Sequence, residues 1–255
     1  MEKESRKIVI VLGGSSGIGK ATAQRFAREG WRVVIASPDT VQLECARNTL
    51  KGEGHISIAL DVRNDADHLN LTKKLKAQGI LHFDVLVNSI GVSEHSGVLD
   101  TDFSAWNNAL EIMLYGTVWS CRTLMPLIRD GGRIVQITSI HYCRVEKGSS
   151  AYGMAKAAIT QFTRSLALEL APRNILANTI APGFIDTPMS VKRNGDNELT
   201  TEWFYDNYIK YDHLPLKRAG KPEEIAGVAF FLAGPDASYM TGSVITVDGG
   251  LTITF

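Results

Sequence analysis

A glycine-rich turn between an apolar run and a helical pattern constrains the fold of this chain more than any other feature. The run Lys7–Leu12 is rich in β-branched residues, as expected of a strand buried on both faces. A helical pattern extends from Lys20 to Glu29, and the turn between them reads Gly13-Gly14-Ser15-Ser16-Gly17-Ile18-Gly19. Glycines let the backbone approach a pyrophosphate, and a helix N-terminus offers free N–H groups. A plain tight turn is the alternative, but glycines at this spacing after the first strand favour dinucleotide binding.

The alternation of strand and helix continues along the whole chain. Further strands are predicted at Trp31–Ala36, His55–Leu60, Val85–Val87, Arg133–Ile137, Leu176–Ile180 and Val244–Val247. Helices are predicted at Thr40–Lys51, Asp65–Gln78, about Phe103–Arg129, about Ser150–Ala171 and Pro222–Leu232. This pattern predicts an α/β fold, a single doubly wound parallel sheet of the Rossmann type with helices on both faces. No repeat or linker interrupts it, so we expect one dinucleotide-binding domain over residues 1–255.

Polar residues and glycines follow directly after most of the predicted strands. Ligands of such sheets bind beyond the carboxyl ends of the strands, so these positions gather on the binding edge. They are Gly13, Ser37, Asp61, Asn88, Ser139 and Pro182-Gly183. From Thr187 to Leu214 the alternation breaks into a polar stretch that also holds Trp203, Phe204 and Tyr205. A loop this long within a domain is typical of a lid, and the aromatic residues favour a substrate-covering lid at 188–214.

Composition excludes several other classes of function. The 255 residues include 27 basic and 27 acidic side chains, so no net field steers the chain toward nucleic acid or an anionic membrane. No apolar run approaches the roughly 20 residues of a membrane span. The three cysteines Cys45, Cys121 and Cys143 have no metal-binding or redox spacing, which suits a reduced compartment. We therefore expect a cytoplasmic protein with a small-molecule substrate, and no metal, nucleic-acid or membrane partner.

Tyr152 and Lys156 form the clearest candidate for catalysis. At positions i and i+4 of a helix, they lie on one face, one turn apart. A phenol has a pKa of about 10 and is a poor base near neutral pH, but a neighbouring cation lowers that pKa. Such a pair can exchange a proton with an alcohol or a carbonyl. Taken singly, the same spacing also arises by chance on exposed helices, so its weight comes from the rest of the chain.

Several motifs stand in an order that resembles the short-chain dehydrogenase/reductase family, over nearly the whole chain from Lys7 to Gly250. They are Gly13-x3-Gly17-Ile18-Gly19, Asp61-Val62, Asn88-Ser89-Ile90-Gly91, Ser139, Tyr152-x3-Lys156, Pro182-Gly183-Phe184-Ile185-Asp186-Thr187 and Val247-Asp248-Gly249-Gly250. Each motif alone is weak, whereas the ordered set is specific. The resemblance implies an NAD(P)-dependent oxidoreductase that interconverts a secondary alcohol and a ketone by hydride transfer.

The resemblance also implies roles for individual residues. Tyr152 is the expected general acid and base, Lys156 holds the nicotinamide ribose and lowers the pKa of Tyr152, and Ser139 orients the reacting oxygen. The expected cofactor-binding residues are Gly13, Ser15, Ser16, Gly17, Ile18, Gly19, Ser37, Asp61, Val62, Asn88, Gly91, Tyr152, Lys156, Pro182, Gly183, Ile185 and Thr187. A homotetramer, or a dimer, joined through the helices around 103–129 and 150–171 is implied as well.

Three positions depart from the family pattern. Leu12 replaces a usual Thr before the glycines, and Ile90 is bulkier than the usual Ala. Met113 stands where the family has a fourth catalytic residue, an Asn that holds a water for proton relay, and a thioether is at best a weak acceptor. Two alternatives therefore stay open: a cofactor-binding regulator that has lost catalysis, and an isomerase or dehydratase of a biosynthetic pathway.

Only a few residues bear on which nucleotide and which substrate the protein binds. Ser37-Pro38 after the second strand offers neither the acid that selects NAD nor a base that selects NADP. The hydroxyls of Ser15, Ser16 and Ser37 suit a phosphate, so of NADP and NAD we favour NADP, while Asp39 is expected to cap the next helix. Polar candidates for a sugar-like, acidic or phosphorylated substrate are His141, Glu146, Lys192, Arg193 and His213.

Overall fold

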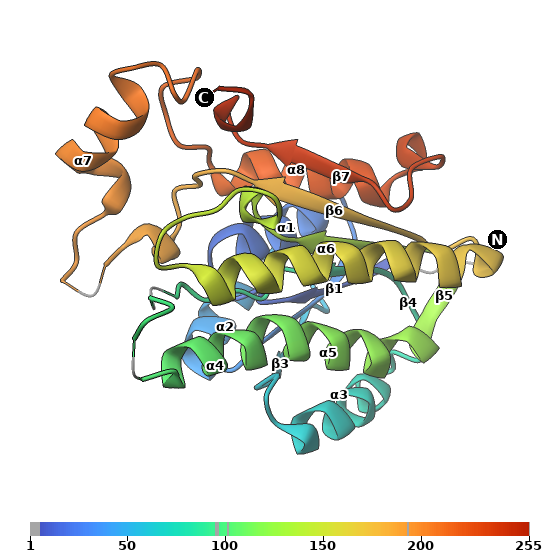
Figure 1. Ribbon diagram of the computed structural model, residues 1–255. Helices are drawn as coiled ribbons and strands as arrows, with labels where there is room; N and C mark the ends of the chain where they lie inside the picture. The colour runs from blue at the N-terminus through green and yellow to red at the C-terminus, as the bar shows by residue number, and fades with distance from the viewer. Residues whose placement is uncertain (1–5, 95–96, 101, 193, 255) are drawn as a thin grey trace.

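Seven parallel strands form one sheet in the order β3-β2-β1-β4-β5-β6-β7 (Figure 1). The computed structural model describes residues 6–94, 97–100, 102–192 and 194–254. The strands are β1 (Ile8–Leu12), β2 (Arg32–Ser37), β3 (Ile56–Ala59), β4 (Phe83–Asn88), β5 (Ile128–Ile137), β6 (Leu176–Pro182) and β7 (Val244–Val247). The strand order reverses between β1 and β4, and a crevice for a ligand forms at such a switch point. The predicted fold class is confirmed.

Helices cover both faces of the sheet (Figure 1). The α-helices of the described residues are α1 (Gly17–Arg28), α2 (Thr40–Arg47), α3 (Asp65–Ala77), α4 (Ser104–Leu110), α5 (Gly116–Leu124), α6 (Ser150–Leu170), α7 (Glu202–Phe204) and α8 (Pro222–Ala233), and of these α7 lies away from the sheet. α3, α5 and α6 pack on one face, whereas α1, α2 and α8 pack on the other. In the part of the chain that the structure describes, no helix has both the length and the apolar character needed to cross a membrane.

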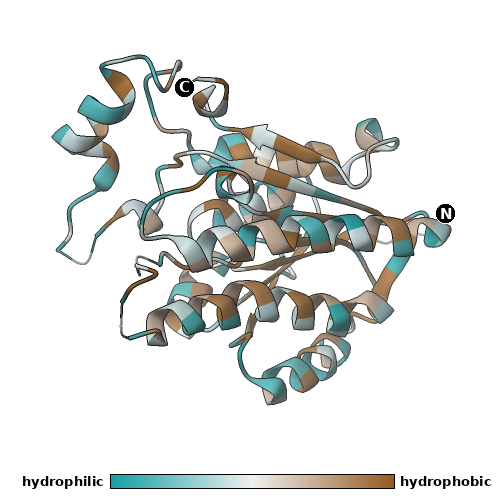
Figure 2. Cartoon of the chain, in the orientation of Figure 1, coloured by the Kyte–Doolittle hydropathy of each residue, from teal (hydrophilic) through white to brown (hydrophobic). Residues whose placement is uncertain are grey.

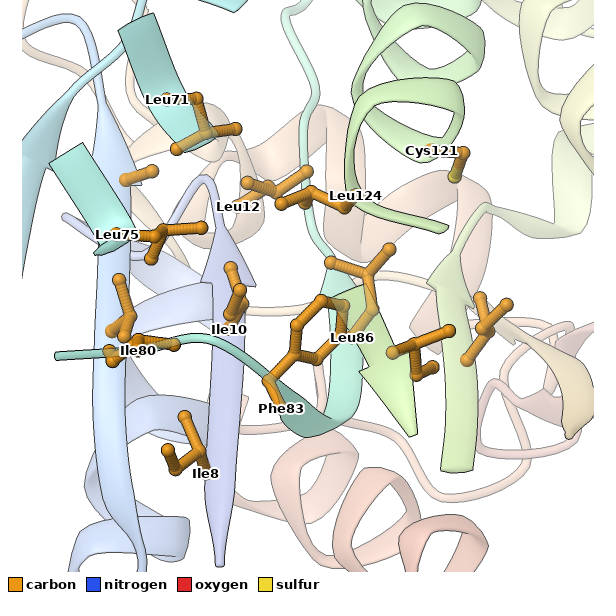
Figure 3. Close-up of a cluster of buried hydrophobic side chains, with 14 of the residues drawn as sticks. Ile8, Ile10, Leu12, Leu71, Leu75, Ile80, Phe83, Leu86, Cys121 and Leu124 are labelled. Carbon is orange, nitrogen blue, oxygen red and sulfur yellow. The ribbon is translucent and has the colours of Figure 1, made fainter. Parts of the chain in front are cut away.

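The central strands supply core residues to both faces, which explains their continuous apolar sequence. In β1, Ile10 and Leu12 face the layer of α3 and α5, while Val9 and Val11 face the layer of α1 and α8. Figure 3 shows the first of these layers, with Phe83 and Leu86 of β4 between the strands and α5. In the hydropathy colouring, the helices carry both hydrophilic and hydrophobic residues (Figure 2). Burial of each large aliphatic side chain stabilises the fold by about 1.5–3 kcal/mol.

The glycine turn brings the start of α1 against the end of β1. Gly13 has a φ of 71°, and a Cβ on Gly19 would lie 2.1 Å from the carbonyl oxygen of Gly13. Only glycine allows this close approach of the two backbone segments. Gly19 lies in the first turn of α1, which begins at Gly17, three residues before the predicted start at Lys20. The turn therefore fixes the N-terminus of α1 at the carboxyl edge of the sheet.

The helical region predicted from about 103 to 129 consists of four helical segments, and β5 begins at its end. A π-helical turn at Glu111–Tyr115 separates α4 from α5, and a short turn with Pro126 ends α5. Proline has no N–H group to continue a helix, so the chain enters β5 at Ile128 rather than Arg133. Gly116 directly follows the π turn, and a Cβ at this position would lie 2.5 Å from the Val62 side chain.

Replacement of Gly19 by Ala tests the contact within the glycine turn. The added methyl group meets the backbone of Gly13, and the displacement is expected to destabilise the protein by about 1–3 kcal/mol. Urea denaturation followed by circular dichroism measures this change. Gly227→Ala is the matched control, because nothing lies within 4 Å of its Cβ position in α8, and it is expected to stabilise the protein by about 0.5–1 kcal/mol. Equal effects of the two substitutions would contradict a special role of the turn.

Candidate active site

A cleft of about 470 Å³ lies at the carboxyl ends of the strands. It extends from the glycine turn to the first turn of α6, and segments far apart in the sequence line it. The expected cofactor-binding residues that line it are Gly13, Ser15, Ser16, Gly17, Ile18, Ser37, Asp61, Val62, Gly91, Tyr152, Lys156, Pro182, Gly183, Ile185 and Thr187, together with Ser139. The structure thus brings nearly all of the predicted site residues to one place.

Gly19 and Asn88 lie behind the wall of the cleft instead. Gly19 packs against the backbone of Gly13, as described above. The Asn88 side chain is buried and donates to Thr117 Oγ1 and Gln136 Oε1, both at 2.8 Å, while its Oδ1 accepts from the N–H of Ile90. Both residues hold the wall in position rather than facing the space it encloses.

Tyr152 lies beside Ser139 and His141 at one end of the cleft. Burial raises the pKa of the Tyr152 phenol, the hydrogen bond with Ser139 lowers it, and the carboxylate of Glu146 adds to the rise. The ring of His141 contacts the Tyr152 ring edge to face, with the centroids 5.6 Å apart. Among the protein's own groups, the cost of desolvating a buried phenolate outweighs the favourable contacts. The lowering expected from Lys156 together with a bound nicotinamide ring stays a prediction.

Lys156 lies one turn farther along α6, on the same face as Tyr152. Its Nζ is 5.5 Å from the centroid of the Tyr152 ring and donates to the backbone oxygens of Ile137 (3.2 Å) and Ile90 (3.4 Å). Burial lowers the pKa of Lys156 from 10.5 to about 8. The side chain is only 3 % exposed, so the fold holds an ammonium group where solvent hardly reaches it.

The first turn of α6, which carries Tyr152, is capped from another segment. Ser149 at the N-cap makes no capping hydrogen bond through its side chain, which instead donates to the backbone oxygen of Glu94 at 3.3 Å. The backbone N–H of Tyr152 donates to Glu94 Oε2, also at 3.3 Å. A carboxylate near a helix N-terminus interacts favourably with the helix dipole. Our sequence analysis missed Glu94, because no local pattern links residues 58 positions apart.

Met113 is completely buried beneath α6. It forms a small apolar cluster with Ala109, Ala151 and Ala155, and its backbone oxygen accepts from Thr117 Oγ1 at 2.6 Å. The thioether therefore packs against the helix that carries Tyr152 and Lys156. An Asn at this position could hold a water molecule through hydrogen bonds. The Met113 thioether has no donor and is at best a weak acceptor, so it cannot take over that role.

The opposite end of the cleft is polar. Ser15 Oγ donates to Ser37 Oγ at 2.9 Å, and Asp39 caps α2 by accepting from the N–H of Gln42, as predicted. The Asp61 carboxylate accepts from the Arg63 side chain, including a contact of 2.7 Å, and this hydrogen bond holds the pKa of Asp61 below its usual value. We did not anticipate Arg63, although its position two residues after Asp61 is a signal that a sequence can reveal.

These residues fit a nicotinamide dinucleotide. The N-cap of α1, Ser16, makes no side-chain capping bond, so the first N–H groups of this helix remain available to an anionic pyrophosphate. The glycine turn leaves room for that group, since Ser16, Gly17 and Ile18 all line the cleft. Within the described residues, no cluster of three or more His, Cys, Asp or Glu side chains could hold a metal ion.

The polar substrate candidates separate into two groups. His141 and Glu146 line the cleft, with His141 Nε2 3.7 Å from Glu146 Oε2. Lys192 does not line it, His213 contacts the backbone oxygen of Asn207, and Arg193 lies outside the described residues. Within the segment 188–214, the residues that line the cleft are Pro188, Met189, Ser190, Glu198 and Leu199. Trp203, Phe204 and Tyr205 do not line it, and Phe204 packs on Phe184.

Replacement of Lys156 by Met is expected to stabilise the fold. A fall of the pKa from 10.5 to about 8 means that protonated Lys156 lowers the free energy of unfolding by up to about 3 kcal/mol below pH 8. The unfolded chain binds this proton until pH 10.5, so the penalty fades as the pH rises from 8 to 10.5. Urea denaturation at pH 7 and pH 10 should show a larger gain for Lys156→Met at pH 7. The exposed control Lys73→Met should change stability by less than about 0.5 kcal/mol at both pH values.

Replacement of Met113 by Asn is expected to destabilise the protein. The amide would enter an apolar cluster of three alanines, and an unpaired buried amide costs about 1–3 kcal/mol. Met113→Leu, which keeps the volume, should cost less than about 1.5 kcal/mol. Thermal unfolding compares the two variants. An unchanged stability in Met113→Asn would mean that the site can supply partners for an amide.

The chain was compared with known families and proteins. A family model described as "Enoyl-(Acyl carrier protein) reductase" matches residues 13–252. Galactitol 2-dehydrogenase (L-tagatose-forming) of Cereibacter sphaeroides is 33% identical over 247 residues, which cover 95% of this chain and 94% of that protein. The 3-oxoacyl-[acyl-carrier-protein] reductase FabG of Chlamydia muridarum is 38% identical over 252 residues, which cover 96% and 97%.

Solved structures give the same result. A variant of the Serratia marcescens short-chain dehydrogenase/reductase superposes with a TM-score of 0.86 at 30% sequence identity, over 96% of this chain and 98% of that one. The family model and the relatives each span almost the whole chain, and residues from most of the ordered motifs that suggested the resemblance line the cleft. The chain therefore belongs to the short-chain dehydrogenase/reductase family of oxidoreductases.

Proposed function

We propose that this oxidoreductase interconverts a secondary alcohol and a ketone with a nicotinamide dinucleotide as its cofactor. The observation that carries the proposal is that Ser139, Tyr152 and Lys156 line the same cleft, with Lys156 Nζ 5.5 Å from the centroid of the Tyr152 ring on the same helix. The bound nicotinamide supplies or accepts the hydride. The residues of the chain supply the proton and hold the reacting oxygen.

Tyr152 is the proton donor and acceptor in this proposal. Its raised pKa keeps the phenol protonated at neutral pH, which is the form that gives a proton to a carbonyl oxygen during reduction. Ser139 holds the same oxygen, and its position is fixed because its Oγ accepts from the backbone N–H of His141 at 3.2 Å. Lys156 places its ammonium group beside Tyr152, and hydrogen bonds to two backbone oxygens orient that group.

For the nucleotide, we propose NADP over NAD. Ser37 is the last residue of β2 and has no carboxylate that would repel a phosphate, and its hydroxyl pairs with that of Ser15 at the edge of the cleft. Two hydroxyls at this position suit a phosphate group on the ribose. Fluorescence titration with NADPH and NADH gives the two dissociation constants that decide between the cofactors.

The names of the relatives leave the substrate class open. One acts on galactitol and another on a 3-oxoacyl group carried by a protein, at 33% and 38% identity to this chain. A secondary alcohol and its ketone are common to both reactions, and this common chemistry is what we propose for the chain.

Assembly into a homotetramer or a dimer is part of the proposal. Exposed apolar side chains on the outer faces of α5 and α6, among them Trp119 and Leu168, support an interface there. The same two helices lie next to each other on one face of the sheet (Figure 1). Light scattering coupled to gel filtration measures the number of subunits.

Tyr152→Phe tests the catalytic proposal. The variant lacks the proton that the reaction needs, and general acid catalysis contributes about 10²–10⁴-fold, so kcat is expected to fall by at least about 10²-fold. The Phe ring keeps the contact with His141, so binding of NADPH should stay within about twofold of the parent. Stopped-flow hydride transfer and nucleotide titration measure the two quantities.

Tyr142→Phe is the matched control, because Tyr142 follows Ser139 by three residues but does not line the cleft. Its activity should equal that of the parent chain. Full activity in Tyr152→Phe would reject the proposed role of the phenol. Tight nucleotide binding by the parent chain without turnover of any alcohol or ketone would instead favour a cofactor-binding regulator, which the buried Met113 makes worth testing.

A further inference from the structure

His141, Glu146, Ser149 and Glu198 line the part of the cleft that we call its substrate end. His141 contacts the Tyr152 ring, and Glu146 and Glu198 both lie close enough to Tyr208 to raise its pKa. From the chemistry of these side chains we propose that the substrate is an uncharged polyol, or the corresponding ketose, that presents several hydroxyl groups. This inference rests on the proposed alcohol oxidation and narrows it. It follows from the hydrogen-bonding capacity and the charge of this part of the cleft.

Hydrogen-bonding groups surround the catalytic phenol. Glu146 and Glu198 are strong acceptors for hydroxyl groups, and Ser149 offers a further oxygen. His141 Nδ1 is buried and makes no hydrogen bond within the described part of the chain. A buried polar atom without a partner costs free energy, and a hydroxyl group of a bound ligand would remove that cost. An apolar alcohol cannot supply such a partner.

The charge at this end is negative. The carboxylates of Glu94, Glu146 and Glu198 line it, and Glu146 lies close enough to Tyr152 and to Tyr208 to raise the pKa of both. Among the described residues that line the cleft, the cationic side chains are Lys156, bound to two backbone oxygens, and Arg63, which pairs with Asp61 at the other end. A carboxylate or phosphate on the substrate would therefore be repelled, so the acidic and phosphorylated classes considered from the sequence are disfavoured.

One of the three carboxylates already has partners within the fold. Glu94 accepts from the first turn of α6, where the helix dipole compensates its charge. Glu146 lies 3.7 Å from His141 Nε2, and burial lowers the pKa of that imidazole, so Glu146 faces a neutral ring. The Glu146 carboxylate can therefore accept hydrogen bonds from hydroxyl groups of a substrate. The aromatic residue Phe184 also lines the cleft and offers an apolar surface for the C–H groups of a polyol.

The proposed oxidation is balanced with the nicotinamide dinucleotide as the oxidant. The secondary hydroxyl group gives its proton to the deprotonated form of Tyr152, and its carbon gives a hydride to the oxidised nucleotide. The products are a ketose, the reduced nucleotide and one proton that Tyr152 returns to solvent. The ketone forms at a carbon whose neighbours both carry hydroxyl groups.

Initial rates with six-carbon compounds that differ in one property test the proposal. The polyols sorbitol and mannitol, the anionic gluconate, the cationic glucamine and the apolar 2-hexanol are offered to the full chain with NADP⁺ and with NAD⁺ at pH 9. We expect kcat/KM for the better polyol to exceed that for 2-hexanol and for gluconate by at least about 10-fold. A higher value for gluconate, glucamine or 2-hexanol than for both polyols would overturn the proposal.

Two substitutions locate the effect in the named carboxylates. Glu146→Gln and Glu198→Gln keep the shape but remove the charge, and each should lower the ratio of kcat/KM for polyol to that for 2-hexanol by at least about 5-fold. The ratio cancels any change in the pKa of Tyr152. Glu202→Gln, an exposed residue of α7 that does not line the cleft, should leave the ratio unchanged. An unchanged ratio in both cleft variants would also overturn the proposal.

Saturation-transfer NMR separates this proposal from the proposed function. Sorbitol and mannitol are added to the protein with the reduced nucleotide, and saturation transfer to the better polyol is expected. Turnover of 2-hexanol without any polyol binding or turnover would reject the polyol class and keep the oxidoreductase. Polyol binding without turnover of any compound would reject the oxidation and keep the polyol site.

Discussion

A buried ammonium group is the constraint on which the site depends. Lys156 is almost fully buried, and two backbone oxygens, from Ile90 after β4 and Ile137 at the end of β5, hold its Nζ. The carboxyl ends of β4 and β5 must therefore both lie next to the Lys156 side chain of α6. The fold tolerates the cost of burying a cation because the sheet and its two layers of helices bury far more apolar surface around it.

The same constraint orders the parts around Tyr152. The start of α6 must lie at a defined position relative to the strand ends, because its first two turns carry both the phenol and the amine. Glu94, in the segment after β4, contacts the first turn of α6, and Ser139, just after β5, lies beside Tyr152. Met113 fills the space under the helix with apolar contacts. The proton-exchanging residue is thus positioned by three segments that are distant in the sequence.

The fold was largely predictable from the sequence because its signals are local. Alternating strands and helices, the glycine turn and the i and i+4 spacing of Tyr152 and Lys156 all rest on periodicity over a few residues. Spacing alone could not reveal the capping of α6 by Glu94, which joins remote positions. Spacing also could not reveal that burial raises the pKa of Tyr152 in the protein's own environment, because proximity to a cation can be counted along a helix whereas burial cannot.

The π-helical turn at Glu111–Tyr115 has an evolutionary consequence. An α-helix rotates by about 100° per residue, so an insertion in its middle normally turns every later side chain away from its partner. A π turn takes up one additional residue locally. Here α4 keeps Ala109 toward α6, and α5 keeps Cys121 and Leu124 toward the sheet. Lineages of this fold can therefore gain or lose a single residue at this point while both ends of the helix stay in phase.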